Sequence, residues 1–122
     1  MRVLRVLIVE DEPLIALDLQ DILQDAHHEV VGIANSMTTA LTLAEAHVPF
    51  DVAIMDVDLA DGSNGIKTAQ RLRDEHNVAS LFVSGRLTEE NRAMAAEWRP
   101  VGFVCKPFLS SQILGALEKV RI

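Results

Sequence analysis

The sequence predicts an α/β protein built on a doubly wound, five-stranded parallel sheet. Five short apolar runs rich in Val and Ile alternate with five longer amphipathic stretches. The first, third and fourth runs are apolar almost without interruption, which is typical of strands covered on both faces. Strands joined by helices imply parallel neighbours with right-handed crossovers, and hence a doubly wound domain.

The five predicted strands are the short apolar runs. They span residues 3–9, 29–34, 51–55, 79–83 and 101–105. Their length and their content of β-branched residues favour strands over helices.

The stretches that follow the strands carry apolar residues at spacings of three and four, which is the period of a helix. They predict helices over residues 13–26, 37–46, 65–75, 88–98 and 110–121. Pro13 fits the first turn of a helix, and Asp11 or Glu12 is the expected N-cap. Thr88 is expected to cap the fourth helix. The chain is therefore expected to form one domain over residues 1–122.

Composition narrows the classes of function. The chain of 122 residues carries a formal net charge of −7, which argues against nonspecific binding to nucleic acid or to an anionic membrane. No apolar run is long enough to span a bilayer, and the N-terminus lacks the pattern of a signal peptide, so a cytoplasmic protein is expected. The single cysteine, Cys105, cannot form an intrachain disulfide and is expected to be buried.

Polar side chains follow four of the five predicted strands, at the edge where ligands bind in a doubly wound sheet. They are Glu10 and Asp11 after the first strand, Asp56 and Asp58 after the third, Ser84 after the fourth and Lys106 after the fifth. If the first and third strands are neighbours, Asp11 and Asp56 lie close together. Carboxylates crowded in this way raise each other's pKa or require a cation, and Mg²⁺ is the natural partner for a few carboxylate oxygens.

The same residues favour chemistry at phosphorus. An aspartate held between Mg²⁺ and an ammonium group is suited to nucleophilic attack on a phosphoryl group. Lys106 supplies the ammonium group, and Ser84 supplies a short hydroxyl. Mg²⁺, Lys106 and Ser84 could each hold one phosphoryl oxygen.

Four motifs at these strand ends resemble those of one family. They are VEDE after the first strand, MDVDL at the third, VSG at the fourth and CKPF at the fifth. In this set and order they resemble the receiver domain of bacterial two-component response regulators over essentially the whole chain. The resemblance implies a flavodoxin-like sheet with strand order 2-1-3-4-5. The glycine-rich loop after MDVDL resembles a subgroup often found as stand-alone or atypical receivers.

The resemblance implies a role for each acid. Asp56 is the phosphoacceptor, which takes a phosphoryl group from a histidine kinase or a histidine phosphotransfer protein. Asp11 and Asp56 are direct ligands of Mg²⁺, the backbone carbonyl of Asp58 is a third, and Glu10 helps to hold the ion through water.

Three further residues are implied as parts of a switch. Ser84 moves toward the phosphoryl group, Phe103 turns inward as it does so, and Lys106 pairs with a phosphoryl oxygen. The bond from Lys106 to Pro107 is expected to be cis, which is plausible only before a proline. The altered surface is expected on the fourth helix, fifth strand and fifth helix, where it would control an output protein that the sequence does not name.

Two surfaces are implied to meet the phosphodonor protein. They are the start of the first helix, with Pro13, Leu14 and Ile15, and the loop with Pro107 and Phe108. The domain itself is expected to be a monomer or a phosphorylation-dependent homodimer, and to catalyse no turnover of a separate substrate.

The sequence also departs from the family pattern. Arg99 and Pro100 stand where receivers often carry a Gly-Ala pair, and Ser84 replaces the more common threonine. By the same resemblance, Asp58 and Arg86 occupy the two positions that in this family tune the access of water to the phosphoryl group. We expect these two to form an ion pair that slows hydrolysis.

Four alternatives remain open from the sequence. The chain could be the receiver of a larger regulator with an effector domain, or a phosphate sink that drains a shared kinase. It could be a haloacid-dehalogenase-like hydrolase, although those enzymes carry Asp-x-Asp after the first strand. It could also be a pseudo-receiver that only binds partners. Trp98 either packs the fourth helix onto the sheet or lies exposed at a binding surface.

Overall fold

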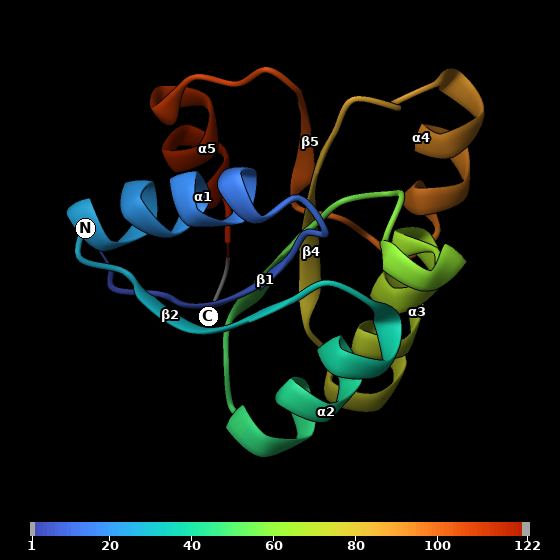
Figure 1. The fold of residues 1–122 in the computed structure, drawn as a ribbon, viewed down its shortest axis with the longest axis horizontal. Coiled ribbons are helices and arrows are strands. Elements are labelled where there is room, and N and C mark those ends of the chain that lie inside the picture. Colours follow the sequence, from blue (N-terminus) through green and yellow to red (C-terminus); the bar gives the residue numbers. More distant parts are fainter. Residues whose placement is uncertain (1, 121–122) are drawn as a thin grey trace.

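The computed structural model describes residues 2–120, except for the side chain of Asp61. Five strands alternate with five helices, as predicted (Figure 1). The strands are β1 (Arg5–Val9), β2 (Glu29–Ala34), β3 (Val52–Met55), β4 (Ala79–Ser84) and β5 (Gly102–Cys105). The helices are α1 (Pro13–Asp25), α2 (Met37–His47), α3 (Gly65–His76), α4 (Glu89–Ala96) and α5 (Ser110–Leu117), and a short 3-10 helix, η1 (Ala60–Gly62), precedes α3.

The sheet has the order β2-β1-β3-β4-β5 with every pair parallel, which confirms the predicted fold class. The chain passes from β2 over β1 to β3, so the order reverses between β1 and β3. In this register Val9 at the end of β1 lies beside Met55 at the end of β3. The residues that follow these two strands therefore emerge side by side at the switch point of the sheet, where ligands bind in such folds.

Helices cover both faces of the sheet. In Figure 1, α1 and α5 lie on one side, and α2, α3 and α4 lie on the other. Two hydrophobic clusters fill the two layers, one beneath α1 and α5 and one beneath α2, α3 and α4. The central strands β1 and β3 are apolar on both faces because both faces are covered, which explains the uninterrupted apolar runs of the sequence.

The prediction that Cys105 is buried is wrong. It ends the edge strand β5, where Val104 is buried and Cys105 is exposed. Successive side chains of a strand point to opposite faces, so Val104 joins the layer beneath α5 while Phe103 and Cys105 point toward α4. On that side Cys105 meets the exposed Arg92, whose Nη2 lies 3.7 Å from its Sγ.

The helix boundaries agree with the predictions to within one residue except at the C-terminal ends of α4 and α5. Pro13 occupies the first turn of α1 as expected, but the N-cap residue Glu12 makes no capping hydrogen bond with its side chain. Thr88 caps α4 by accepting a hydrogen bond from the amide of Asn91 at 3.0 Å. Helix α4 ends at Ala96 and α5 at Leu117, each short of its predicted end.

The early end of α4 follows from its C-terminal turn. The backbone of Arg99 has a φ of 51°, a left-handed conformation that favours glycine, at the position where receivers often carry a small pair. Arg73 of α3 holds this turn, because its Nη2 donates to the carbonyl of Arg99 at 2.7 Å and its Nε to that of Trp98 at 3.1 Å. A long side chain from a neighbouring helix thus stabilises a turn in which the chain lacks glycine.

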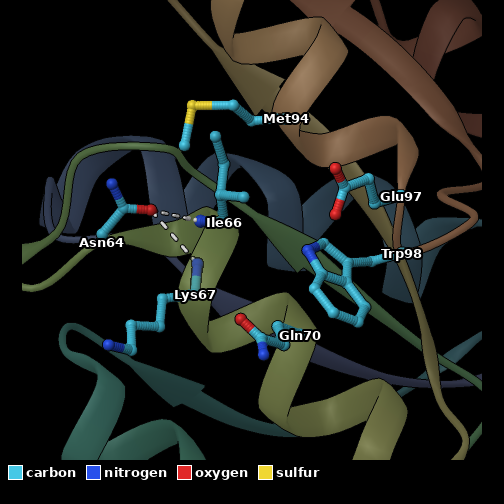
Figure 2. Close-up of a pocket in the computed structure, with 7 residues that line it drawn as sticks. All are labelled: Asn64, Ile66, Lys67, Gln70, Met94, Glu97 and Trp98. Atoms are coloured by element: carbon cyan, nitrogen blue, oxygen red, sulfur yellow. Dashed lines mark hydrogen bonds between the residues drawn. The ribbon is translucent and has the colours of Figure 1, made fainter.

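Trp98 both packs against the core and lies at an open surface, so each of its two predicted roles is partly correct. Its half-buried ring packs against the hydrophobic cluster beneath α4. It also lines an open groove between α3 and α4, together with Ile66 and Met94 (Figure 2). Within residues 2–120, none of the helices combines the length and the apolar character needed to cross a membrane.

Candidate functional site

Two buried acids are positioned by the ends of the central strands. The ladder of hydrogen bonds continues one residue beyond the strands, since the amide of Asp56 donates to the carbonyl of Val9 at 3.0 Å and that of Glu10 to Ala34 at 2.8 Å. Both side chains are buried. With Asp11 they form a cluster in which one carboxylate oxygen of each residue lies within 4.8 Å of the others. The predicted convergence of these acids is confirmed.

Lys106 bridges the two buried carboxylates. Its Nζ lies 2.8 Å from Asp56 Oδ2 and 2.7 Å from Glu10 Oε1. The amide of Lys106 donates to the carbonyl of Ser84 at 3.0 Å, which extends the pairing of β4 with β5 and places the side chain. The bond to Pro107 is cis, as predicted. The cluster thus combines three carboxylates with one ammonium group, which contacts two of them, and it keeps a net negative charge.

The environment shifts two pKa values in this cluster. Burial, together with the negative charge of Asp56, raises the pKa of Glu10 to about 7, although hydrogen bonds from Lys106 and the amide of Glu12 act in the opposite direction. Burial disfavours the charge on Lys106, but hydrogen bonds to Asp56 and Glu10 outweigh it and raise the pKa of Lys106. The ammonium group therefore stays charged at neutral pH, and Glu10 is poised to gain or lose a proton.

The raised pKa of Glu10 predicts a pH dependence of stability in the metal-free protein. Folded Glu10 titrates near pH 7 and unfolded Glu10 near 4.5, so the folded state binds more protons between these values. The free energy of unfolding is therefore expected to fall as the pH rises through this window, by up to about 3 kcal/mol. Urea unfolding in EDTA at several pH values measures it. Glu10→Gln should flatten this slope, and a variant curve parallel to that of the wild type would contradict the assignment.

The acids fit a hard divalent cation. Three carboxylates offer oxygen ligands, and their excess negative charge within the cluster favours a positive ion. An open cavity of about 350 Å³ lies beside Glu10 and Asp11, toward Ile33, Asn35 and Thr39, so water can reach these two acids. The donor set is therefore compatible with Mg²⁺, which keeps several water ligands when bound to proteins.

The loop between β3 and α3 packs tightly against the backbone of Asp56. Asp58 and Asn64 form an antiparallel bridge across the loop, and the side chain of Asn64 caps α3 by accepting from the amide of Ile66 at 2.7 Å. Next to the cap, the amide of Gly65 donates to the carbonyl of Val57 at 2.7 Å. A Cβ added at Gly65 would lie only 1.7 Å from the carbonyl oxygen of Asp56. Sequence reasoning missed this residue, although it follows the glycine-rich loop that the sequence showed after MDVDL.

Ser84 lies on β4 and Phe103 on β5, the two strands that follow β3 in the sheet. Ser84 is buried at the end of β4, and its Oγ accepts a hydrogen bond from the amide of Arg86 at 3.1 Å. Phe103 of β5 is half-buried and stacks on Phe82 with the ring centroids 5.8 Å apart. The predicted ion pair is present, since Arg86 Nη1 lies 3.3 Å from Asp58 Oδ1. Both partners are largely exposed, so the pair itself contributes little to stability.

The residues predicted to meet a phosphodonor protein differ in exposure. Leu14 is 82% exposed and Pro13 is exposed, whereas Ile15 packs partly into the cluster beneath α1. Pro107 is exposed and Phe108 is half-buried against the same cluster. Two further apolar residues extend this exposed area and were missed from the sequence. They are Leu17 on α1 and Leu109 in the loop before α5.

The matched family agrees with the geometry of the site. The family model described as response regulator receiver domain matches residues 6–118. The chain belongs to this family. A receiver domain is a signalling domain, so the hydrolase alternative finds no support in the match.

Receiver domains of several bacteria resemble this one. The phyllosphere-induced regulator PhyR of Methylorubrum extorquens is 29% identical over 114 residues, which cover 93% of this chain and 42% of that protein. The transcriptional regulatory protein PdtaR of Mycobacterium tuberculosis is 36% identical over 118 residues, which cover 93% of this chain and 55% of that protein. This receiver domain thus spans about half the length of the curated relatives it matches.

A solved structure supports the fold of the receiver domain. The crystal structure of the signal receiver domain of a modulated diguanylate cyclase from Desulfovibrio desulfuricans superposes with a TM-score of 0.87 at 27% identity. The superposition covers 96% of this chain and 92% of that one. The similarity therefore extends over nearly the whole of both domains.

Proposed function

We propose that this receiver domain accepts a phosphoryl group on Asp56 in a Mg²⁺-dependent reaction. The phosphoryl group would come from a histidine kinase or a histidine phosphotransfer protein. The observation that carries the proposal is the position of Asp56, which lies at the end of a central strand, 2.8 Å from Lys106 and within the acidic cluster. Elsewhere in the described residues, no other group of three or more His, Cys, Asp or Glu side chains is placed to hold a metal ion.

The reaction assigns a role to each residue of the cluster. Asp11 and Asp56 would bind Mg²⁺ directly, the carbonyl of Asp58 would be the third protein ligand, and Glu10 would act through water. The bound ion would neutralise charge on the phosphoryl oxygens. The carboxylate of Asp56 is the nucleophile, and Lys106 holds one of its two oxygens. Its bond to phosphorus forms as the bond from phosphorus to the donor atom breaks, and the leaving group keeps that electron pair.

The added charge would then change the surface of the domain. Lys106 transfers its hydrogen bond from Asp56 to a phosphoryl oxygen, and Ser84 leaves the amide of Arg86 to reach another. Phe103 moves with Ser84, and the altered surface comprises α4, β5 and α5. Phosphorylation thus shifts an equilibrium between two arrangements of this surface, which an output protein reads.

The exposed apolar area near the site supports docking of the phosphodonor protein. The exposed residues Pro13 and Leu14 lie on α1, and the exposed residues Pro107 and Leu109 lie in the loop before α5. Helices α1 and α5 cover the same face of the sheet (Figure 1). Exposed leucines are favourable contacts for a partner helix because their burial removes apolar surface from water. Together with the half-buried Ile15 and Phe108, these residues form the proposed docking surface.

Incubation with Mg²⁺ and a small phosphodonor such as acetyl phosphate tests the proposal. Intact-mass analysis should show one added phosphoryl group, and EDTA should prevent its addition. A pseudo-receiver would take up none in either condition.

We further propose that residues 1–122 form one receiver unit in a cytoplasmic signalling protein. Whether it acts alone or beside an effector domain is decided by the length of the encoded protein. A phosphate sink would differ from both, because it affects output only by draining phosphoryl groups from a kinase that it shares with other receivers. Deletion of those other receivers would therefore abolish its effect on output. Sedimentation with and without phosphodonor distinguishes a constant monomer from a phosphorylation-dependent homodimer.

The ion pair of Asp58 with Arg86 is expected to lengthen the lifetime of the phosphoryl group on Asp56. Arg86→Ala is expected to shorten the half-life of the phosphorylated protein, because the pair connects the loops that follow β3 and β4 beside Asp56 and limits the approach of water. The change should reach at most about fivefold, since exposed ion pairs contribute up to about 1 kcal/mol. Loss of phosphate over time after removal of the phosphodonor measures it.

Arg71→Ala is the matched control for this variant. Arg71 is also an exposed arginine in an ion pair, with Glu75, but it lies on α3. Its replacement should leave the half-life unchanged. An unchanged or longer half-life in Arg86→Ala refutes the shielding role.

A further inference from the structure

Helix α4 is attached to the rest of the domain at few places. Among its residues only Ala95 is buried. Its start is tied to the loop after β4, where Asn91 Nδ2 donates to the carbonyl of Arg86 at 2.8 Å. Its end is tied to α3 through Arg73. An open groove of about 360 Å³ lies between α3 and α4, lined by apolar and polar side chains (Figure 2). The helix therefore has room to shift, as elements with few buried contacts do.

The middle of α4 is tied to β5 through Arg92. The guanidinium carbon of Arg92 lies 5.1 Å from the centroid of the Phe103 ring, a cation–π contact. Two polar contacts hold it there, from Nε to the carbonyl of Leu87 at 3.3 Å and from Nη2 to Cys105 Sγ at 3.7 Å. Phe103 also stacks on Phe82. The ring of Phe103 thus contacts both the core and the exposed arginine.

The bonding partners of Lys106 and Ser84 identify the resting arrangement of the proposed switch, which is the one before phosphorylation. Lys106 is bonded to both Asp56 and Glu10, and the hydroxyl of Ser84 accepts from the amide of Arg86. In the proposed switch, Lys106 transfers its hydrogen bond from Asp56 to a phosphoryl oxygen, and Ser84 moves toward another. The position of Phe103 beneath Arg92 therefore belongs to the resting arrangement.

We infer that Arg92 is a positioning residue, which holds Phe103 in the resting arrangement and thereby opposes occupation of the phosphoryl site at Asp56. The inference rests on the proposed function, and it adds a residue that neither the strand-end motifs nor the acidic cluster includes. A contact that is present in only one of two arrangements lowers the population of the other arrangement. The apparent affinity of a ligand that binds only this other arrangement falls with its population. Loss of an exposed cation–π contact corresponds to about two- to fivefold.

Binding of beryllofluoride, a stable mimic of the phosphoryl group, tests the inference. ¹⁹F NMR of the bound ion gives its apparent dissociation constant at fixed Mg²⁺. Arg92→Ala is expected to bind beryllofluoride about two- to fivefold more tightly than the wild type. Arg92→Lys should fall between them, because lysine keeps the charge but loses the planar fork that makes the two polar contacts. Arg71→Ala is the control and should bind as the wild type does.

A double-mutant cycle separates this role from a general effect on folding. In the Phe103→Leu background, Arg92→Ala should change the dissociation constant no further, because the ring on which Arg92 acts is gone. An equal gain in both backgrounds overturns the inference. Urea unfolding checks the stability of each variant, and Arg92→Lys carries the comparison if Arg92→Ala does not fold.

The outcomes also distinguish this inference from the proposed function. If the wild type binds beryllofluoride and Asp56→Asn does not, while Arg92→Ala binds with unchanged or lower affinity, the role of Arg92 is overturned and the proposed function stands. If the wild type binds none, or Asp56→Asn binds it equally well, the proposed function itself fails.

Discussion

Asp56→Asn is expected to take up no phosphoryl group from acetyl phosphate and Mg²⁺ under conditions in which the wild type takes up one. The asparagine side chain has nearly the same size and keeps an oxygen, but it carries no negative charge and is a poor nucleophile. It also removes one carboxylate from the acidic cluster, which weakens the attraction for Mg²⁺. Because the nucleophile itself is lost, the chemical step cannot proceed, and the loss should be complete at any phosphodonor concentration. Intact-mass analysis after a fixed incubation measures it.

Asp58→Asn is the matched control for this experiment. The same substitution two residues away alters an exposed side chain and leaves the backbone carbonyl, which is the proposed ligand. It should still take up one phosphoryl group, which is then expected to be lost at most about fivefold faster because the ion pair with Arg86 is broken. Equal labelling of Asp56→Asn and the wild type would show that the phosphoacceptor lies elsewhere, whereas loss in both variants would point to a damaged loop rather than to a lost nucleophile.

Gly65→Ala is expected to lower the free energy of unfolding by about 2–4 kcal/mol. The added Cβ would lie 1.7 Å from the carbonyl oxygen of Asp56 and 2.8 Å from its carbonyl carbon. Both atoms belong to the backbone, so no side chain can rotate away to make room. Either α3 moves outward or the backbone at Asp56 shifts, and the second change also displaces the phosphoacceptor. Urea unfolding measures the loss, and the yield of phosphorylated protein measures the effect on the site.

The same substitution at Gly115 provides the control. Gly115 lies within α5, and a Cβ added there meets no atom within 4 Å. Gly115→Ala should therefore raise the free energy of unfolding, by about 0.5–1 kcal/mol, because alanine loses less conformational freedom than glycine in a helix. If both variants have the stability of the wild type, the close packing of α3 against Asp56 is wrong.

Local patterns in the sequence were sufficient to predict the elements and their class. The spacing of apolar residues distinguishes β3, which is a continuous apolar run, from α3, in which apolar residues recur every three or four positions. The burial of β1 and β3 on both faces follows from their uninterrupted apolar runs. The acids and the lysine could be assigned to one edge of the sheet because all strands of a parallel sheet end at that edge. The strand order came only from the family resemblance, since no local pattern tells which strands are neighbours.

The exposure of Cys105 shows where a local pattern is insufficient. Its neighbours in β5 are apolar, and cysteine is commonly buried, so burial was a reasonable prediction. The outcome depends on the edge position of β5 and on the short helix α4 above it, and both are properties of the assembled domain.

The sequence by itself therefore determined the five strand-helix units and the presence of acids, a hydroxyl and a lysine at the strand ends, because these depend on residues close together in the chain. Only the tertiary structure decided that Lys106 bridges Glu10 and Asp56, that Gly65 packs against the carbonyl of Asp56, and that Arg92 covers Phe103. The contacts of Lys106 join segments that are far apart in the sequence. Like the contacts of Gly65 and Arg92, they arise from the way in which strands and helices pack. Their geometry is fixed by the sheet register and by helix packing, which the spacing of residues along the chain does not encode.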